Sequence, residues 1–195
     1  MVAQVEGTEG IKFTVDLEDW YSALHIWPNK GEEMIRENTE YILKQLDKYH
    51  VKAHFYVLGM LAEERPKLIK EIASLGHKIG SHGFIHWHNE KEGDKGDLAC
   101  RELLKELGIT CEGYRSPYWE HTAMPGWSGG FFFRVLPYNI LVKNIMKSGT
   151  FWVHPHDIAL NHSRLTNPWL NWKRHINLKG ARVKLERLLQ ELPWQ

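Results

Sequence analysis

Short apolar segments alternate with amphipathic segments along most of this 195-residue chain. The apolar segments are rich in β-branched and aromatic residues and predict strands over residues 11–15, 51–58, 77–81, 109–114 and 150–153. Apolar residues at helical spacing predict helices over residues 34–49, 60–75, 100–107, 137–146 and 178–192. This alternation indicates an α/β fold, in which parallel strands are joined by right-handed crossovers and loops gather at the strands' carboxyl ends.

Three segments depart from simple alternation. Pro66 is expected to restart a helix inside residues 60–75, because proline suits the first turn of a helix. Residues 131–133 are interpreted as a short strand, and residues 161–172 as a polar, Trp-rich connection without regular structure. The stretch 117–130 has no periodicity, and a loop of that length in a small domain is typical of a functional segment.

Composition limits the class of protein. With 43% hydrophobic and 25% charged residues, we expect residues 1–195 to form a single globular domain. The formal net charge of +1, with scattered basic residues, argues against a nucleic-acid partner or an anionic membrane surface. No signal-peptide pattern is visible and no apolar run approaches the ~20 residues of a transmembrane helix, so we predict a cytoplasmic protein. The oligomeric state is not indicated.

The number and spacing of cysteines also favour the cytoplasm. The chain contains two cysteines, Cys100 and Cys111, in a predicted helix and the strand after it. No Cys-x-x-Cys pattern accompanies them, so we expect two reduced, mostly buried thiols.

Polar side chains follow four of the predicted strands. Because the carboxyl ends of parallel strands meet at one edge of a sheet, we expect these side chains to converge. His82 and His86 are four positions apart, which places both imidazoles on one face if a helical turn forms. Alone, this pair is a weak signal in a chain with 12 histidines. With one carboxylate and an open position for water, two imidazoles match the ligand set of a hydrolytic zinc-type site.

Together these motifs resemble the polysaccharide deacetylases of the NodB-homology group, carbohydrate esterase family 4. The first motif corresponds to Thr-Val-Asp-Leu-Glu-Asp at residues 14–19, in the longer Asp-x-Glu-Asp form of a subgroup tied to surface polysaccharide synthesis. The second, third and fifth motifs correspond to residues 82–86, 115–118 and 153–155, and residues 129–138 and 174–178 are also similar to that subgroup. The resemblance covers residues 11–192 and implies a distorted (β/α) barrel, which is incomplete if the strand near the fourth motif is missing.

The resemblance implies a divalent metal site. Asp19, His82 and His86 would hold the metal, with Glu18 as the alternative carboxylate ligand. Zn²⁺ is the expected ion, although Co²⁺, Ni²⁺ or Mn²⁺ would suit the same ligands. The implied activity is metal-dependent removal of N-acetyl groups from an amino sugar of a surface polysaccharide or its precursor.

The resemblance also implies four catalytic roles. Asp16 would be the general base, and Arg115 would orient it and keep it ionised. The backbone N–H of Tyr118 would stabilise the oxyanion, and His154 would protonate the departing amine.

One element of the family pattern is missing. The fourth motif, which supplies a carboxylate that tunes the acid histidine and a tryptophan that lines the sugar pocket, has no counterpart between Trp119 and Gly129. Asp157 and Glu120 are the candidate replacements. If neither serves, the chain is a catalytically weak or silent carbohydrate-binding domain, and a second alternative is a hydrolase of a small non-sugar amide. Least expected are purely structural histidines without metal.

Overall fold

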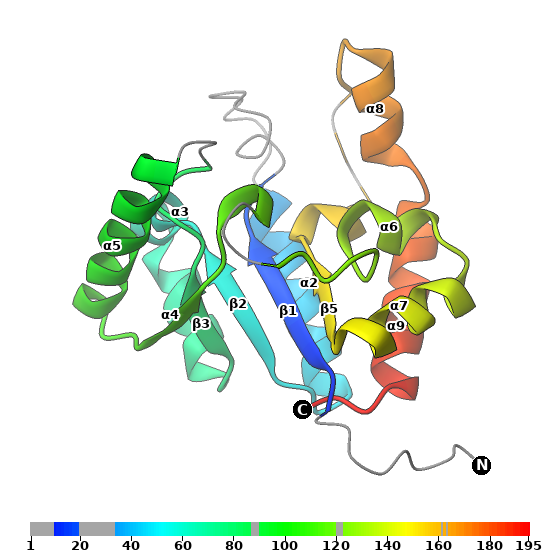
Figure 1. The fold of residues 1–195 in the computed structure, drawn as a ribbon, viewed down its shortest axis with the longest axis horizontal. Coiled ribbons are helices and arrows are strands. Elements are labelled where there is room, and N and C mark those ends of the chain that lie inside the picture. Colours follow the sequence, from blue (N-terminus) through cyan, green and yellow to red (C-terminus); the bar gives the residue numbers. More distant parts are fainter. Residues whose placement is uncertain (1–9, 20–33, 87–89, 120–122, 161, 163) are drawn as a thin grey trace.

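Five parallel strands form one sheet in the computed structural model, which describes residues 10–19, 34–86, 90–119, 123–160, 162 and 164–195. The strand order is β4-β3-β2-β1-β5, so the N-terminal strand lies inside the sheet (Figure 1). All five predicted strands are present, within three residues of the expected bounds. They are β1 (Lys12–Leu17), β2 (Ala53–Val57), β3 (Lys78–Ser81), β4 (Cys111–Tyr114) and β5 (Thr150–Val153).

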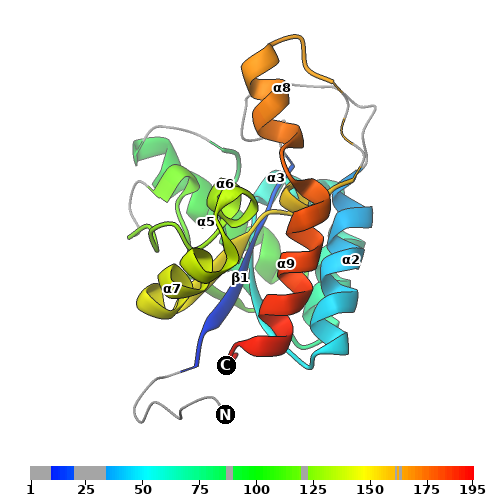
Figure 2. The ribbon, with the colours of Figure 1, turned by 90° about the vertical axis from the view of Figure 1, so that its right-hand side faces the viewer.

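Helices connect the strands and cover the sheet. Figure 1 shows α5 beside β3 and β4 and α7 beside β5, and Figure 2 shows α2 and α9 side by side. The helices are α2 (Met34–Lys48), α3 (Gly59–Glu64), α4 (Pro66–Ser74), α5 (Glu90–Glu106), α6 (Gly130–Val135), α7 (Tyr138–Ser148), α8 (Pro168–His175) and α9 (Leu178–Glu191), with short 3-10 turns η1 (Pro117–Trp119) and η2 (Pro155–Ile158). Pro66 opens α4 after a break at Arg65, which confirms the predicted restart.

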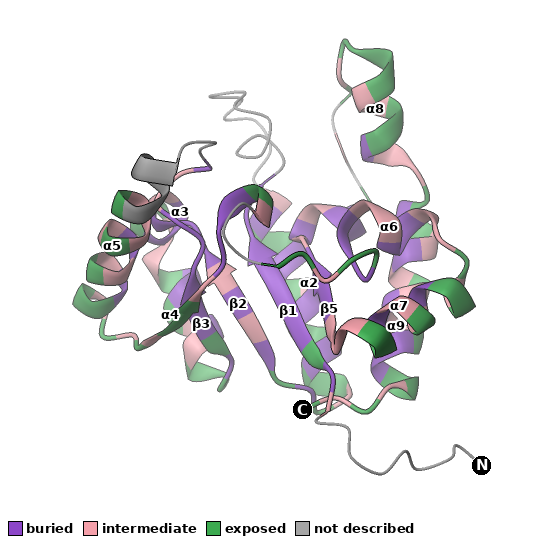
Figure 3. Ribbon diagram, viewed as in Figure 1, coloured by how far each residue is buried: buried purple, intermediate pink, exposed green. Residues whose placement is uncertain are grey.

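The two faces of the sheet differ in chemistry because side chains alternate along each strand. One face of β1 carries Phe13, Val15 and Leu17, which belong to the buried apolar core together with residues of α2 and α9. The opposite face carries Thr14 and Asp16, which are buried as well. Figure 3 shows β1 buried along most of its length.

The polar face of β1 is extended by its neighbours. Asp16 is opposite Tyr56 of β2, and Tyr56 is opposite Gly80 of β3. Thr14 is opposite His54 on one side and Trp152 on the other. The structure therefore presents a polar and aromatic sheet face, next to which the functional side chains gather.

The sheet is open, with β4 and β5 at its two edges. Beyond β5, an isolated parallel bridge joins Gly129 to Trp152, where a closed barrel would have its next strand. The architecture is the predicted α/β fold, a distorted barrel that remains incomplete.

Two predicted segments differ from the structure. Residues 131–133, interpreted as a strand, lie in α6, because a short apolar run does not by itself distinguish strand from buried helix. Residues 161–172 were expected to be irregular, but α8 begins at Pro168. Asn167 caps this helix by accepting hydrogen bonds from the backbone N–H groups of Trp169 and Leu170. Asparagine followed by proline is typical of a helix N-terminus, so this pair was a sequence signal for the start of α8.

Cys100 and Cys111 are both free thiols, the first buried and the second half-buried. Among the described residues, no helix combines the length and the hydrophobicity needed to cross a bilayer.

Candidate active site

Asp16 and Arg115 form a buried ion pair at the carboxyl end of β1. Arg115 Nη1 donates a hydrogen bond to Asp16 Oδ1 at 2.5 Å, and both side chains are less than a tenth exposed. The guanidinium lies between two rings, 4.1 Å from the centroid of Tyr56 and 4.4 Å from that of Trp119. Burial raises the pKa of Asp16, but Arg115 and nearby histidines outweigh it and leave the pKa below its ordinary value. Asp16 is therefore a buried carboxylate that Arg115 holds in its ionised form.

His82 and His86 are brought together by an irregular loop after β3, and the helical turn that the spacing suggested does not form. Gly83 has φ +81, a conformation that suits glycine. His82 Nδ1 lies 2.7 Å from the carbonyl oxygen of Arg115, to which it donates its proton. This leaves Nε2 of His82 with a lone pair, and burial lowers the pKa of the ring, which favours the neutral, ligating form. His86 packs edge-on against the Tyr118 ring at 4.1 Å.

Glu18 joins the two histidines in a buried group. One ligand atom from each of Glu18, His82 and His86 lies within 4.8 Å of the others. Glu18 Oε2 lies 3.1 Å from His86 Nε2, yet this buried oxygen has no hydrogen-bond partner. Burial raises the pKa of Glu18 to about 8, whereas a bound cation would favour the carboxylate. An unsatisfied buried oxygen beside two imidazoles is the environment that a divalent metal requires, so these residues fit such an ion.

Asp19, which the resemblance assigns to the metal, is also buried but does not belong to this group of three. The chain turns directly after β1, where the backbone N–H of Glu18 donates to the carbonyl oxygen of Asp16 at 3.0 Å, so the alternation of the strand does not carry over to positions 18 and 19.

His154 is held by Asp157, three residues further along the chain. Asp157 Oδ2 accepts hydrogen bonds from His154 Nδ1 at 2.8 Å and from the His154 backbone N–H at 3.0 Å. Arg134 Nε lies 3.1 Å from Asp157 Oδ1, and His154 Nε2 lies 3.3 Å from Glu18 Oε1. Burial lowers the pKa of His154, but Asp157 and the other carboxylates raise it to about 9, which favours a protonated acid.

Asp157, one of the two candidate replacements for the missing fourth motif, thus lies against His154. Burial opposes ionisation of Asp157, but His154 and Arg134 keep its pKa well below its usual range. The other candidate, Glu120, lies outside the described residues. Arg134 lies within residues 129–138, a segment of the resemblance, but no role was assigned to it, because its contact with Asp157 depends on α6 folding against η2.

The third motif adopts an unusual backbone conformation. Tyr118 and Trp119 have φ of 56 and 62, values that residues with bulky side chains rarely adopt. The Trp119 ring packs edge-on against Trp152 at 5.4 Å, and Trp152 packs edge-on against His154 at 5.3 Å. These rings surround the polar groups with an aromatic wall that sequence analysis did not identify.

Two family models match the chain. The model described as "Polysaccharide deacetylase" matches residues 27–126, which is just over half of the chain. The chain belongs to the polysaccharide deacetylase family. A second model, "Domain of unknown function (DUF3473)", matches residues 115–195, the part that contributes Arg134, His154 and Asp157.

A named relative supports this membership. A peptidoglycan-N-acetylglucosamine deacetylase from Bacillus cereus is 38% identical over 89 residues, which cover 43% of this chain and 32% of that protein. The match therefore spans about a third of that relative.

Several solved structures share the fold. The peptidoglycan deacetylase PdaC from Bacillus subtilis has a TM-score of 0.58 at 16% identity, over 95% of this chain and 86% of that chain. A pseudoenzyme of carbohydrate esterase family 4 from Bacillus anthracis also has a TM-score of 0.58 at 14% identity. The match covers 96% of this chain and 63% of that chain.

Proposed function

We propose that this protein is a metal-dependent hydrolase that removes N-acetyl groups from an amino sugar of a polysaccharide or its precursor. The observation that carries the proposal is the connection of a buried base and a half-buried acid to one candidate metal group. Asp16 is linked to that group through Arg115, whose carbonyl oxygen accepts from His82. His154 contacts the group directly through Glu18.

The metal would be held by Glu18, His82 and His86, and Zn²⁺ is the ion that we expect. Co²⁺, Ni²⁺ and Mn²⁺ suit the same nitrogen and oxygen ligands. When bound there, such an ion polarises a carbonyl and makes a nearby water more acidic.

The residues of the chain would supply the proton transfers. Asp16 accepts a proton from the water that attacks the acetamide carbon, and Arg115 holds this carboxylate in its ionised form. The backbone N–H of Tyr118 donates a hydrogen bond to the carbonyl oxygen as negative charge develops there. His154 Nε2 donates a proton to the amide nitrogen as the C–N bond breaks. The products are acetate and the free amino sugar.

The choice of Glu18 over Asp19 can be tested by metal content. We expect Glu18→Gln and His82→Ala to lose bound zinc, because each removes a ligand from the group of three, and Asp19→Asn to retain it. Zinc is measured by elemental analysis of purified, folded protein. Loss of zinc in Asp19→Asn with retention in Glu18→Gln would return the ligand role to Asp19.

The names of relatives support an N-acetylated glycan as the substrate, since the Bacillus cereus and Bacillus subtilis proteins are peptidoglycan deacetylases. The presence of Asp157 beside His154 supports an active enzyme over the silent sugar-binding alternative. The cytoplasmic location remains a prediction.

The activity is tested by acetate release from N-acetylglucosamine oligomers and N-acetylated polysaccharides with zinc-loaded protein. We expect Asp16→Asn to lower the rate by about 100-fold or more, the usual contribution of a general base. Asp97→Asn, at a partly exposed ion pair with Arg101 on α5, is the matched control. Sugar binding without acetate release would favour the silent domain, and hydrolysis of simple acetamides alone would favour a small-amide hydrolase.

A further inference from the structure

Helix α8 carries two exposed tryptophans beyond the carboxyl end of the sheet, where the site residues also lie (Figures 1 and 2). Trp169 is 65% exposed and Trp172 is 46% exposed, and their rings stack at 4.9 Å with an interplanar angle of 23°. Within α8 only Arg174 is buried, and Figure 3 shows the rest of the helix as exposed or intermediate. The two indoles therefore add little to the core, and their exposure at this end of the domain suggests a ligand.

The base of α8 is firmly held although the helix buries no apolar side chain. The backbone N–H of Leu165 donates to Asn171 Oδ1 at 2.9 Å, and His175 Nε2 lies 3.2 Å from the carbonyl oxygen of His162. Arg134 Nη1 donates to the carbonyl oxygen of Arg174 at 3.0 Å. These bonds orient the tryptophans before any ligand arrives, which reduces the entropy lost on binding.

The same contacts join α8 to the segment that carries the acid histidine. Arg134 holds both the end of α8 and Asp157, the partner of His154. His162 Nε2 donates to the carbonyl oxygen of His156 at 3.0 Å, and His156 is two residues after His154 in the chain.

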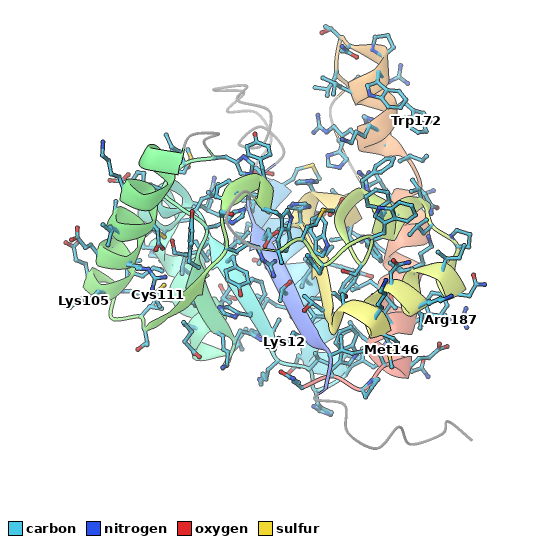
Figure 4. The ribbon with its side chains drawn as sticks, viewed as in Figure 1. Lys12, Lys105, Cys111, Met146, Trp172 and Arg187 are labelled. Atoms are coloured by element: carbon cyan, nitrogen blue, oxygen red, sulfur yellow. The ribbon has the colours of Figure 1, made fainter. Side chains whose placement is uncertain are left out.

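An aromatic contact continues this connection. Trp172, labelled in Figure 4, lies 6.3 Å from the ring of Phe131 on α6. The two glycines before Phe131 pack against Trp152, which in turn contacts His154.

We propose that Trp169, Trp172 and Phe131 form a platform on which a glycan chain stacks sugar rings remote from the residue being deacetylated. The inference rests on the proposed function and deepens it, because it makes the substrate a chain of several sugars. Flat aromatic faces suit the apolar C–H faces of pyranose rings, while the sugar hydroxyls stay in water. A membrane surface fits less well, because an eight-residue helix with three apolar side chains lacks the broad apolar face of an interfacial helix.

The platform is tested by sugar-binding affinity as a function of chain length. The probes are N-acetylglucosamine and its β-1,4-linked oligomers up to the hexamer, measured by calorimetry in an Asp16→Asn background to prevent turnover. We expect affinity to rise with length, and Trp169→Ala/Trp172→Ala to weaken hexamer binding about tenfold without changing binding of the single sugar. Phenylalanine at both positions should restore most of the affinity.

Leu98→Ala removes an equally exposed apolar side chain from α5 and serves as the matched control. Hexamer affinity that is unchanged in the double alanine variant, or no gain with length in the parent, would overturn the platform. If the double alanine variant loses binding to phosphatidylglycerol vesicles but keeps its binding to the hexamer, the tryptophans belong to a lipid-binding surface. That result would also overturn the platform. Length-dependent binding without acetate release by the unaltered protein would sustain the platform and reject the hydrolase.

Discussion

Replacement of Asp157 by asparagine tests whether this carboxylate takes the place of the family's fourth motif. The side chain is 1% exposed, bonds to both Nδ1 and the backbone N–H of His154, and pairs with Arg134. Asparagine keeps the shape and removes the charge that stabilises the protonated imidazole. A charge-assisted hydrogen bond contributes about 1.5–3 kcal/mol, so we expect kcat for amide hydrolysis to fall by roughly 10- to 100-fold.

The assay compares two leaving groups. An N-acetyl sugar releases an amine that must be protonated, whereas an aryl acetate releases a phenolate that leaves without a proton. We therefore expect Asp157→Asn to slow hydrolysis of the N-acetyl sugar while hydrolysis of the aryl acetate stays within about twofold, because His154 acts on the leaving group. KM for the sugar should change little.

Folding must be measured in the same variant, because Arg134 loses its buried partner. We expect the free energy of unfolding in urea to fall by about 3 kcal/mol, a typical effect of breaking a buried ion pair. Asp97→Asn is the matched control. Equal losses on both substrates would mean that the variant disturbs the whole site, and an unchanged kcat for the amide in folded protein would refute the role of Asp157.

Two further predictions concern the backbone. Gly130→Ala should lower the free energy of unfolding in urea by about 2 kcal/mol, because φ is +53 and a Cβ atom would lie 2.3 Å from the Trp152 ring. Gly149→Ala, also at positive φ but with open space around it, should cost only about 1 kcal/mol. Tyr118→Gly keeps the backbone N–H, so acetate release should stay within about tenfold of the parent, less than loss of an oxyanion donor costs. A fall of about 100-fold would assign the oxyanion role to the phenol ring, which contacts His86.

The strands and the positions of the polar motifs were predictable because both depend on local pattern. A buried parallel strand must be apolar over several consecutive residues, as residues 51–58 are, and the sheet brings the ends of such strands to one edge. Asp16, Arg115, His82 and His154 therefore meet where the sequence predicted.

The contacts among these residues were less predictable. Glu18 and Asp19 are adjacent in the sequence, and the end of β1 determines which one lies beside the histidines. Asp157 and Glu120 were both candidates as partners for His154, and the 2.8 Å contact of Asp157 comes from the turn η2, which the sequence pattern did not predict. The strand predicted over residues 131–133 was wrong, because three successive phenylalanines show neither the helical nor the strand periodicity of apolar residues.

The sequence by itself determined the α/β class, the alternation of parallel strands with helices, and the motifs that mark the family. These follow from periodicity and from residues close together in the chain. Only the tertiary structure decided which carboxylates lie beside His82, His86 and His154, and that aromatic residues of α6 and α8 contact one another. Those choices depend on contacts such as Arg134 with Asp157 and Trp172 with Phe131, which join segments whose approach is set by packing of the whole chain.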